Sequence, residues 1–178
     1  ITAVKTQFLS FGGSTLVPSI ANELPGMPVK AKTALLEILA SRKSKENVDL
    51  VLKETDSQEP EVRMAALIAL PDLVSGKDLD KLYDLLRRVK TPEELYVVQS
   101  SVIAALSGLS KDDQAAAIIS KLNNTTGANR SLFYGILAGI GNQRSLKTVT
   151  TEFAEGKPEL KYKAFEALTK WSDPVGIH

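Results

Sequence analysis

A leucine recurs at nearly constant separation along the chain, and this recurrence limits the fold more than any other feature does. The residues are Leu9, Leu39, Leu70, Leu106, Leu137 and Leu168, with consecutive separations of 30, 31, 36, 31 and 31 residues. A period of this length, with two helical patterns in each unit, is typical of stacked helical hairpins. The sequence therefore predicts an all-α solenoid of about five hairpins, with a leftover inner helix at the N-terminus.

Each repeat divides into an outer and an inner helix. We expect outer helices over Ser14–Leu24, Lys45–Glu54, Asp78–Val89, Lys111–Leu122 and Ser145–Glu155. The inner helices are expected to begin near Pro28, Pro60, Pro92, Ala128 and Pro158. Proline suits a first helical position because it has no N–H to leave unpaired. The five extra residues before Leu106 are expected to lengthen the helices of the third hairpin.

The inner helices share an apolar face. The recurring leucine and the residues 3 and 4 before it and 3 after it lie on one side of a helix. From the second to the fifth repeat these sets are Leu70, Leu67, Ala66 and Leu73; Leu106, Ile103, Val102 and Leu109; Leu137, Tyr134, Phe133 and Ile140; and Leu168, Phe165, Ala164 and Trp171. We predict that these sets form the core. Only Arg42, in the first repeat, departs from the pattern.

The segment from Asp56 to Leu70 carries a family resemblance. It has a turn aspartate, a Val-Arg pair at Val62 and Arg63, small residues and a closing leucine. This order resembles the consensus of the HEAT-repeat family, and weaker versions of the motif cover almost the whole chain. The resemblance implies a right-handed α-α superhelix and a scaffold role, and it implies no substrate.

The two ends of the chain suggest a wider context. The chain begins at Ile1 and ends at His178, so we expect a segment of a larger protein, in which residues 1–178 form a single HEAT-like repeat domain. The run from Ala167 to Pro174 also resembles repeat ends in bacterial multidomain proteins. In some of those proteins helical repeats precede a sugar-processing domain.

Composition removes several classes of function. The 22 basic and 21 acidic residues give a net charge of +1, so no global field attracts nucleic acid or an acidic membrane. No apolar run approaches the length of a membrane-spanning helix. The absence of cysteine excludes disulfides, thiolate nucleophiles and Cys-ligated metals. The compartment stays open between the cytoplasm and a bacterial periplasm or exterior, and so does the oligomeric state.

The chain offers little material for catalysis. His178 is its only histidine, and no glycine-rich phosphate-binding motif is present. The acidic pairs Asp78/Asp80, Glu93/Glu94 and Asp112/Asp113 fall in predicted first helical turns, where acids interact favourably with the helix dipole. We therefore expect no enzyme activity, no catalytic residue, no metal site and no cofactor.

A basic ladder lies seven residues before each leucine. Its members are Lys32, Arg63, Gln99, Arg130 and Lys161. One interpretation is a stripe for anions or nucleic acid. The interpretation that we favour is structural, because these positions point toward the stack. Each basic side chain is then expected to bind carbonyl groups of a turn or an acidic residue of a neighbouring repeat.

The face opposite the core supplies the functional hypothesis. Four small or apolar residues on it, Ile68, Ala104, Leu132 and Gly135, are expected to form the floor of a contact surface. The alternative is that curvature of the stack buries them. The predicted function is a non-catalytic scaffold that binds a protein or a neighbouring domain on its concave face. The alternatives are an accessory segment of a carbohydrate-processing enzyme and a nucleic-acid-binding repeat protein.

Overall fold

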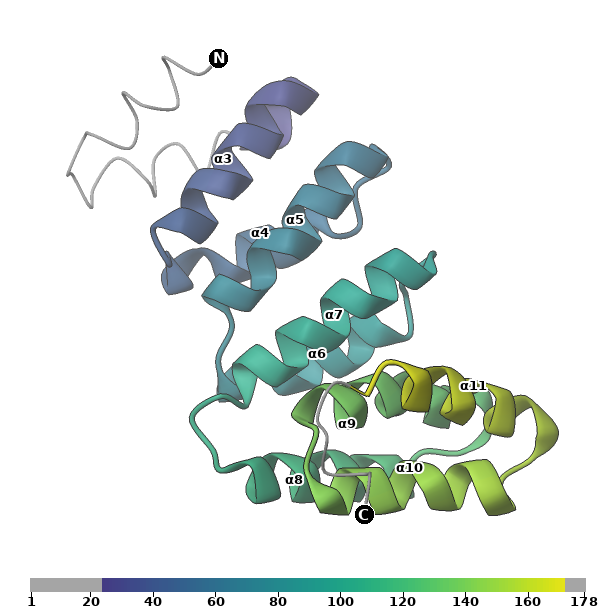
Figure 1. Ribbon diagram of the computed structural model, residues 1–178. Coiled ribbons are helices and arrows are strands. Elements are labelled where there is room, and N and C mark those ends of the chain that lie inside the picture. Colours follow the sequence, from purple (N-terminus) through teal and green to yellow (C-terminus); the bar gives the residue numbers. More distant parts are fainter. Residues whose placement is uncertain (1–23, 172–178) are drawn as a thin grey trace. The chain divides into compact units, whose positions relative to one another are not determined.

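The computed structural model describes residues 24–171 and shows an all-helical chain over that range (Figure 1). These residues form nine α-helices and four short 3-10 helices, with no β-strand among them. The prediction of an all-α fold is confirmed. The chain divides between Val74 and Ser75 into two compact units, called unit 1 and unit 2 below, and each is described by itself.

The described residues of unit 1, 24–74, form three α-helices, and the last of them is central. They are α3 (Val29–Ser41), α4 (Val48–Glu54) and α5 (Pro60–Leu73), and 3-10 turns cover Leu24–Gly26 and Lys45–Asn47. Both α3 and α4 pack against α5. The predicted core set of the second repeat, Leu70, Leu67, Ala66 and Leu73, is buried as expected. Leu36, Leu39 and Val51 complete this core from α3 and α4.

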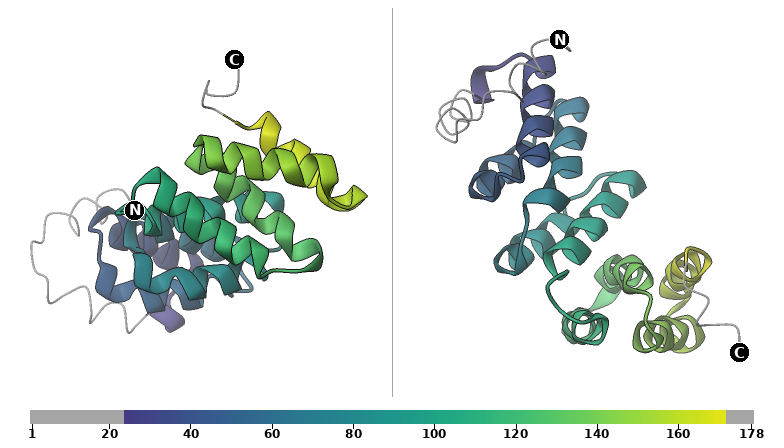
Figure 2. Two further views of the ribbon diagram at one scale, coloured as in Figure 1. Left: turned by 90° about the horizontal axis from the view of Figure 1, so that it is seen from below. Right: turned by 60° about the vertical axis from the view of Figure 1, so that its left-hand side comes forward.

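Within unit 2, residues 75–171 form six α-helices in two rows. They are α6 (Leu79–Leu86), α7 (Pro92–Ala105), α8 (Lys111–Asn123), α9 (Tyr134–Ile140), α10 (Gln143–Glu155) and α11 (Pro158–Thr169), with 3-10 helices at Gly76–Asp78 and Gly127–Phe133. In one row α9 packs between α7 and α11, and in the other α8 packs on α10. Figure 2 shows α9 and α11 end-on above α8 and α10. The predicted core set of the fourth repeat is buried throughout.

Most of the predicted helices agree with the structure where it describes them. The range Lys45–Glu54 matches a 3-10 turn followed by α4, and Pro60, Pro92 and Pro158 each occupy the first position of a helix. The inner helix expected from Ala128 begins instead as a 3-10 helix and becomes α-helical only at Tyr134. The predicted segment Ser14–Leu24, apart from Leu24, and the leftover inner helix around Leu9 lie outside the described residues.

The third repeat differs from its prediction. Leu106 is the C-cap of α7, whereas Leu70 lies inside α5. Counted from the first proline of each helix, Val102 corresponds to Leu70, and the extra residues follow Val102. They do not lengthen the third hairpin, because α6 has 8 residues and α7 has 14, as α5 has. Val102 and Leu106 are both buried, so an apolar pattern alone fits either one as the repeat position.

The core sets of the third and fifth repeats are only partly buried. Leu109 is 48% exposed, since it lies beyond the end of α7. On α11, Ala164 is buried but Phe165 is 51% exposed, and its ring contacts that of Phe153 with centroids 6.1 Å apart. Within residues 24–171 no helix follows α11 to cover this face.

Candidate functional site

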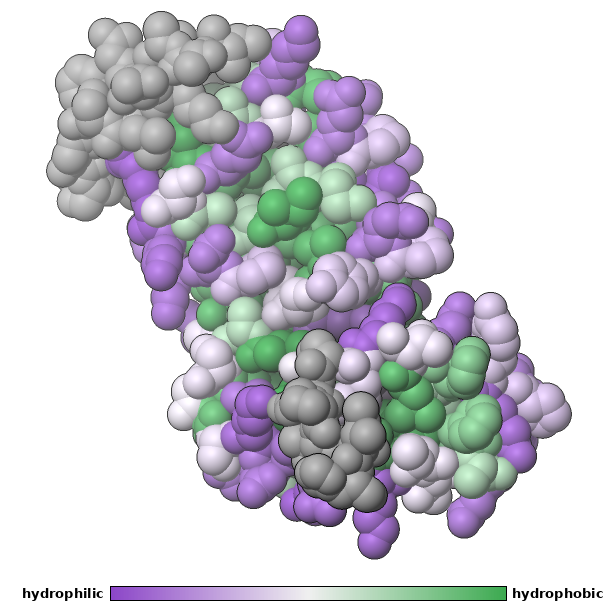
Figure 3. Space-filling view, viewed as in Figure 1, coloured by the Kyte–Doolittle hydropathy of each residue, from purple (hydrophilic) through white to green (hydrophobic). Residues whose placement is uncertain are grey.

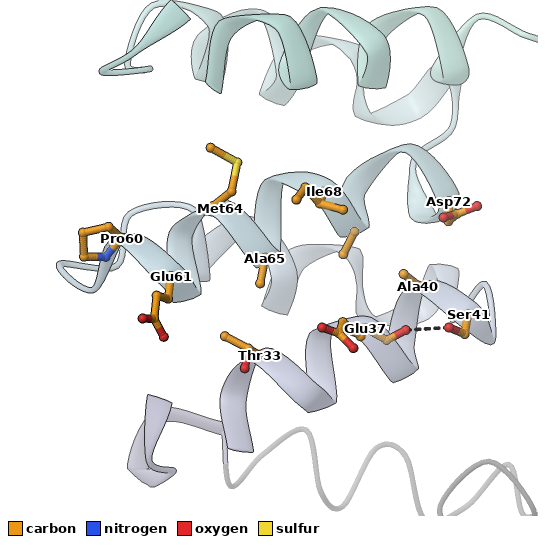
Figure 4. A pocket seen from close by; sticks show the side chains of 11 residues that line it. Thr33, Glu37, Ala40, Ser41, Pro60, Glu61, Met64, Ala65, Ile68 and Asp72 are labelled. Carbon is orange, nitrogen blue, oxygen red and sulfur yellow. Dashed lines mark hydrogen bonds between the residues drawn. The ribbon is translucent and has the colours of Figure 1, made fainter. Parts of the chain in front are cut away.

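A groove lies between α3 and α5 of unit 1, and we call it the unit 1 groove (Figure 4). Its volume is about 810 Å³. It is lined by Thr33, Glu37, Ala40, Ser41, Pro60, Glu61, Met64, Ala65, Ile68, Ala69 and Asp72. Ile68 is 58% exposed in it, beside the apolar side chains of Met64 and Ala65.

The spacing of these residues explains why they share one surface. On α5, Glu61, Ala65, Ile68 and Asp72 follow an i, i+4, i+7, i+11 pattern, which places side chains along one stripe of a helix. The buried stripe of α5, which includes Leu67 and Leu70, points elsewhere into the core. The packing of α5 on its own core therefore leaves the Ile68 stripe facing solvent.

The groove is apolar in its centre and acidic at its edge. Met64, Ala65 and Ile68 form the apolar centre, and Figure 3 shows an apolar patch over α5 with hydrophilic side chains on either side. Glu37, Glu61 and Asp72 supply the charge, and no lysine or arginine is among the described residues that line the groove. Such a surface favours cationic groups around an apolar contact.

A second groove crosses three inner segments of unit 2, and we call it the unit 2 groove. It is lined by Pro92, Leu95, Tyr96, Gln99, Ser131, Tyr134, Gly135, Ala138, Gly139, Lys163, Glu166, Ala167 and Lys170. Its charges are mixed, because Lys163 forms an ion pair with Glu166 at 2.6 Å. The hydrogen bond from Lys163 lowers the pKa of the Glu166 carboxyl below its usual value. Tyr96 is 63% exposed and presents an accessible aromatic ring in this groove.

At two glycines of the unit 2 groove, a neighbouring helix occupies the space that a side chain would need. A Cβ at Gly135 would collide with the amide of Gln99, and a Cβ at Gly139 would collide with Ile103. Gln99 is buried and donates from Nε2 to the carbonyl oxygen of Leu132 at 2.9 Å. Close packing of α7 on α9 is therefore sufficient to explain both glycines.

The four predicted contact residues do not share one groove. Ile68 lines the unit 1 groove and Gly135 lines the unit 2 groove. Ala104 and Leu132 are half-buried, and neither lines one of the two grooves. The acids Glu61 and Asp72 were missed by the sequence interpretation, although their placement 7 residues before and 4 after Ile68 would have shown that all three share a stripe.

The basic ladder serves the packing of helices, as expected. Lys32 binds Glu54 of α4 at 3.2 Å, Arg63 donates to the carbonyl of Ser57, and Lys161 donates to the carbonyl of Ala154. Arg130 donates from Nη1 to the carbonyls of Leu122 and Thr125 and pairs through its other nitrogens with Glu152 of α10. Each of these basic side chains therefore binds a turn or a neighbouring helix.

Glu152 is the centre of a polar cluster in unit 2. It accepts hydrogen bonds from the Arg130 guanidinium and from the Tyr134 hydroxyl. Burial acts to raise the pKa of Glu152, but the hydrogen bonds from Arg130 and Tyr134 outweigh it, so the net pKa lies below the usual value. Burial and the bond to Glu152 raise the pKa of the Tyr134 hydroxyl. The cluster stays charged at neutral pH and joins three helical segments.

The acidic pairs have structural partners in the described structure. Asp78 is buried and accepts from the backbone N–H and the hydroxyl of Ser75. Thr91 caps α7, because its hydroxyl oxygen accepts from the backbone N–H of Glu94. The Glu94 carboxylate accepts in turn from the backbone N–H of Lys90 and not from that of Thr91. At the start of α8 the Asp113 carboxylate accepts from the Ser110 hydroxyl, and the backbone N–H of Asp113 donates to the oxygen of that hydroxyl. These contacts agree with helix capping.

The described part of the chain shows neither a metal-binding cluster nor a membrane span. Residues 24–171 contain no cluster of His, Cys, Asp or Glu side chains arranged to hold a metal ion, and no helix among them is both long and apolar enough to span a membrane. Comparisons with protein-family models, curated proteins and solved structures give no match to this chain. The resemblance to HEAT repeats therefore stays a prediction from the sequence.

Proposed function

We propose that this chain is a non-catalytic scaffold, a right-handed α-α superhelix of HEAT-like hairpins that binds a protein segment on its inner helices. Two ion pairs support the proposal that distant repeats make the same contacts. Lys32 pairs with Glu54 and Arg130 pairs with Glu152, and in both cases an inner segment bonds the next outer helix 22 residues later. Such a repeated contact is what a stack of similar hairpins requires.

The unit 1 groove carries the proposal of binding. A large apolar side chain that is 58% exposed, on a surface hollowed between two helices, gains free energy when a partner covers it. Side chains of small volume at Ala40 and Ala65 let a partner approach the helix backbones closely. The partner can be a separate protein or an adjoining domain, since both would present the same apolar contact.

Nucleic acid suits this groove poorly. Binding to phosphates requires closely spaced lysine and arginine side chains. Glu37, Glu61 and Asp72 give the groove the opposite charge, and the basic ladder is engaged in helix packing. A protein segment is therefore the partner that the groove supports best.

The test is selection from a displayed library of short helices with one randomised face. Wild-type protein should enrich helices that no longer bind the Ile68→Lys variant. Leu109→Lys is the matched control, because Leu109 is similarly exposed but lies in a turn outside both grooves. Its binding should equal that of the wild type. Enriched helices that bind all three proteins equally, or no enrichment at all, would contradict the proposed function.

A further inference from the structure

We propose that the occupant of the unit 1 groove is an amphipathic α-helix with lysine or arginine residues at both ends of its apolar stripe. This inference rests on the proposed function and names the chemistry of the partner. It is carried by three features of the groove, namely its two helical walls, its small apolar centre and the positions of its acids.

The walls of the groove favour a helix over an extended segment. On α3 the residues Thr33, Glu37 and Ala40 follow the i, i+4 and i+7 spacing of a helix–helix seam. Glu61, Ala65 and Ile68 follow the same spacing on α5. Figure 4 shows the two helices presenting these side chains toward the space between them. An extended peptide that binds by strand addition needs the free edge of a sheet, and the described residues form no strand. A third helix can instead pack its own stripe between the two walls.

The centre of the groove selects an apolar contact. Ile68 and Met64 offer large side chains, and Ala65 lies beside them on the side of α3. A leucine or isoleucine of the occupant can lie over Ala65 and against Ile68, so both apolar surfaces leave water together. The helix needs an apolar stripe of about two turns to match this centre.

The acids select basic residues at the ends. Glu61 and Asp72 are 11 residues apart on α5, which corresponds to about 16 Å along the helix axis. Glu37 contributes a third carboxylate from α3. A helix laid along the groove therefore meets acids near both ends, and basic residues about 11 positions apart on it would reach them.

The experiment compares three synthetic 18-residue helices with the same leucine and alanine stripe. One carries lysine at the two end positions and near the middle, and the others carry glutamine or glutamate there. Binding to the full chain is measured by fluorescence anisotropy in low salt and in 0.5 M NaCl. The lysine helix should bind about tenfold more tightly than the glutamine helix in low salt, and high salt should remove most of that preference.

A charge-reversed protein makes the test specific to the groove. Glu37→Lys, Glu61→Lys and Asp72→Lys together should reverse the preference, so that the glutamate helix binds best. The matched control is Glu46→Lys, Glu155→Lys and Glu159→Lys, which changes the net charge equally at exposed positions outside both grooves. This control should keep the preference for the lysine helix.

The possible outcomes separate the inference from the proposed function. If the glutamine helix binds as tightly as the lysine helix and loses its binding with Ile68→Lys, the inference is overturned while the proposed function stands. If none of the three helices binds, the inference also fails, and the library selection alone then decides the proposed function. If the control variant, with its three substitutions outside the grooves, also loses the preference for the lysine helix, that preference is a nonspecific charge effect. This result would overturn the inference.

Discussion

The two grooves arise from the same sequence pattern and yet present different surfaces. In unit 1 the residue two before the repeat leucine is Ile68, which is largely exposed. In unit 2 the equivalent residue is Gly135, and the amide of Gln99 already occupies the place of its side chain. One groove therefore offers an apolar contact, while the other is closed at the same position by a neighbouring helix.

The difference between Ile68 and Gly135 shows what decides whether this position of a helical hairpin is accessible to a partner. The neighbour of Ile68 across the groove is α3, which contributes small residues and carboxylates and leaves the isoleucine uncovered. The neighbour of Gly135 is α7, whose Gln99 reaches across to the carbonyl of Leu132. The side chain on the adjacent repeat, and not the residue at the position itself, determines which surface is accessible.

The largest expected effect on stability is at Gly135. Replacement with leucine places a large side chain where Gln99 lies, which breaks the bond to Leu132 and overpacks the α7–α9 contact. We expect the free energy of unfolding to fall by about 2–3 kcal/mol, measured by urea denaturation. Gly108→Leu is the control, because a Cβ at Gly108 meets no atom nearby. Equal losses in the two variants would argue against a filled position at Gly135.

The next effect concerns Glu152. Its replacement with glutamine removes the charge that balances Arg130, and we expect a loss of about 2 kcal/mol at pH 7. Because the folded pKa of Glu152 lies below its ordinary value of 4.5, this contribution is present above pH 4.5 and is lost as the pH falls through the folded pKa. Urea denaturation should therefore show the two proteins converging below pH 4.5. A difference that persists unchanged at pH 3 would refute the role of the charge.

The corresponding pair in unit 1 should contribute less. Lys32 and Glu54 form a single contact at 3.2 Å, whereas Glu152 accepts from both Arg130 and Tyr134. We expect Glu54→Gln to cost about 1 kcal/mol in urea denaturation at pH 7, because it weakens one hydrogen bond to a charged group instead of two. A cost above that of Glu152→Gln would reverse the ranking of the two ion pairs.

The smallest effect on stability is expected at Ile68. Because its side chain is mostly exposed, Ile68→Lys should change the free energy of unfolding by less than about 0.5 kcal/mol. Far-ultraviolet circular dichroism and urea denaturation test this directly. A loss of 2 kcal/mol or more would mean that Ile68 contributes to the core, and the contrast with Gly135 would disappear.

The helices of this chain could largely be predicted, because proline and leucine mark them strongly. Pro60 and Pro92 begin helices, as their missing N–H groups suggest, and Leu70 closes a fully buried stripe. The recurring-leucine pattern puts the third repeat four residues out of register. Val102 and Leu106 are both buried, and a search for leucine chooses Leu106 although Val102 is the residue equivalent to Leu70. That error moved the expected contact residue to Ala104, where Ser100 holds the position equivalent to Ile68.

The candidate site could be predicted only in part. Ile68 could be identified because solvent alone does not require an isoleucine on the face opposite the core stripe. The identity of Gly135 suggested an open floor, but the sequence cannot show that Gln99, 36 residues earlier, fills that space. Glu37, Glu61 and Asp72 come together only when α3 packs on α5, so their common groove depends on tertiary structure.

The most direct test of the account is to map where a helix binds on the folded chain. The lysine helix can be titrated into isotopically labelled protein while the backbone amide resonances are followed by NMR. We predict chemical-shift changes that concentrate at Thr33, Ala65 and Ile68 and that vanish in the Ile68→Lys variant. Changes that concentrate around Tyr96 and Gly135 instead, or that persist in that variant, would contradict the claim that the unit 1 groove is the contact surface.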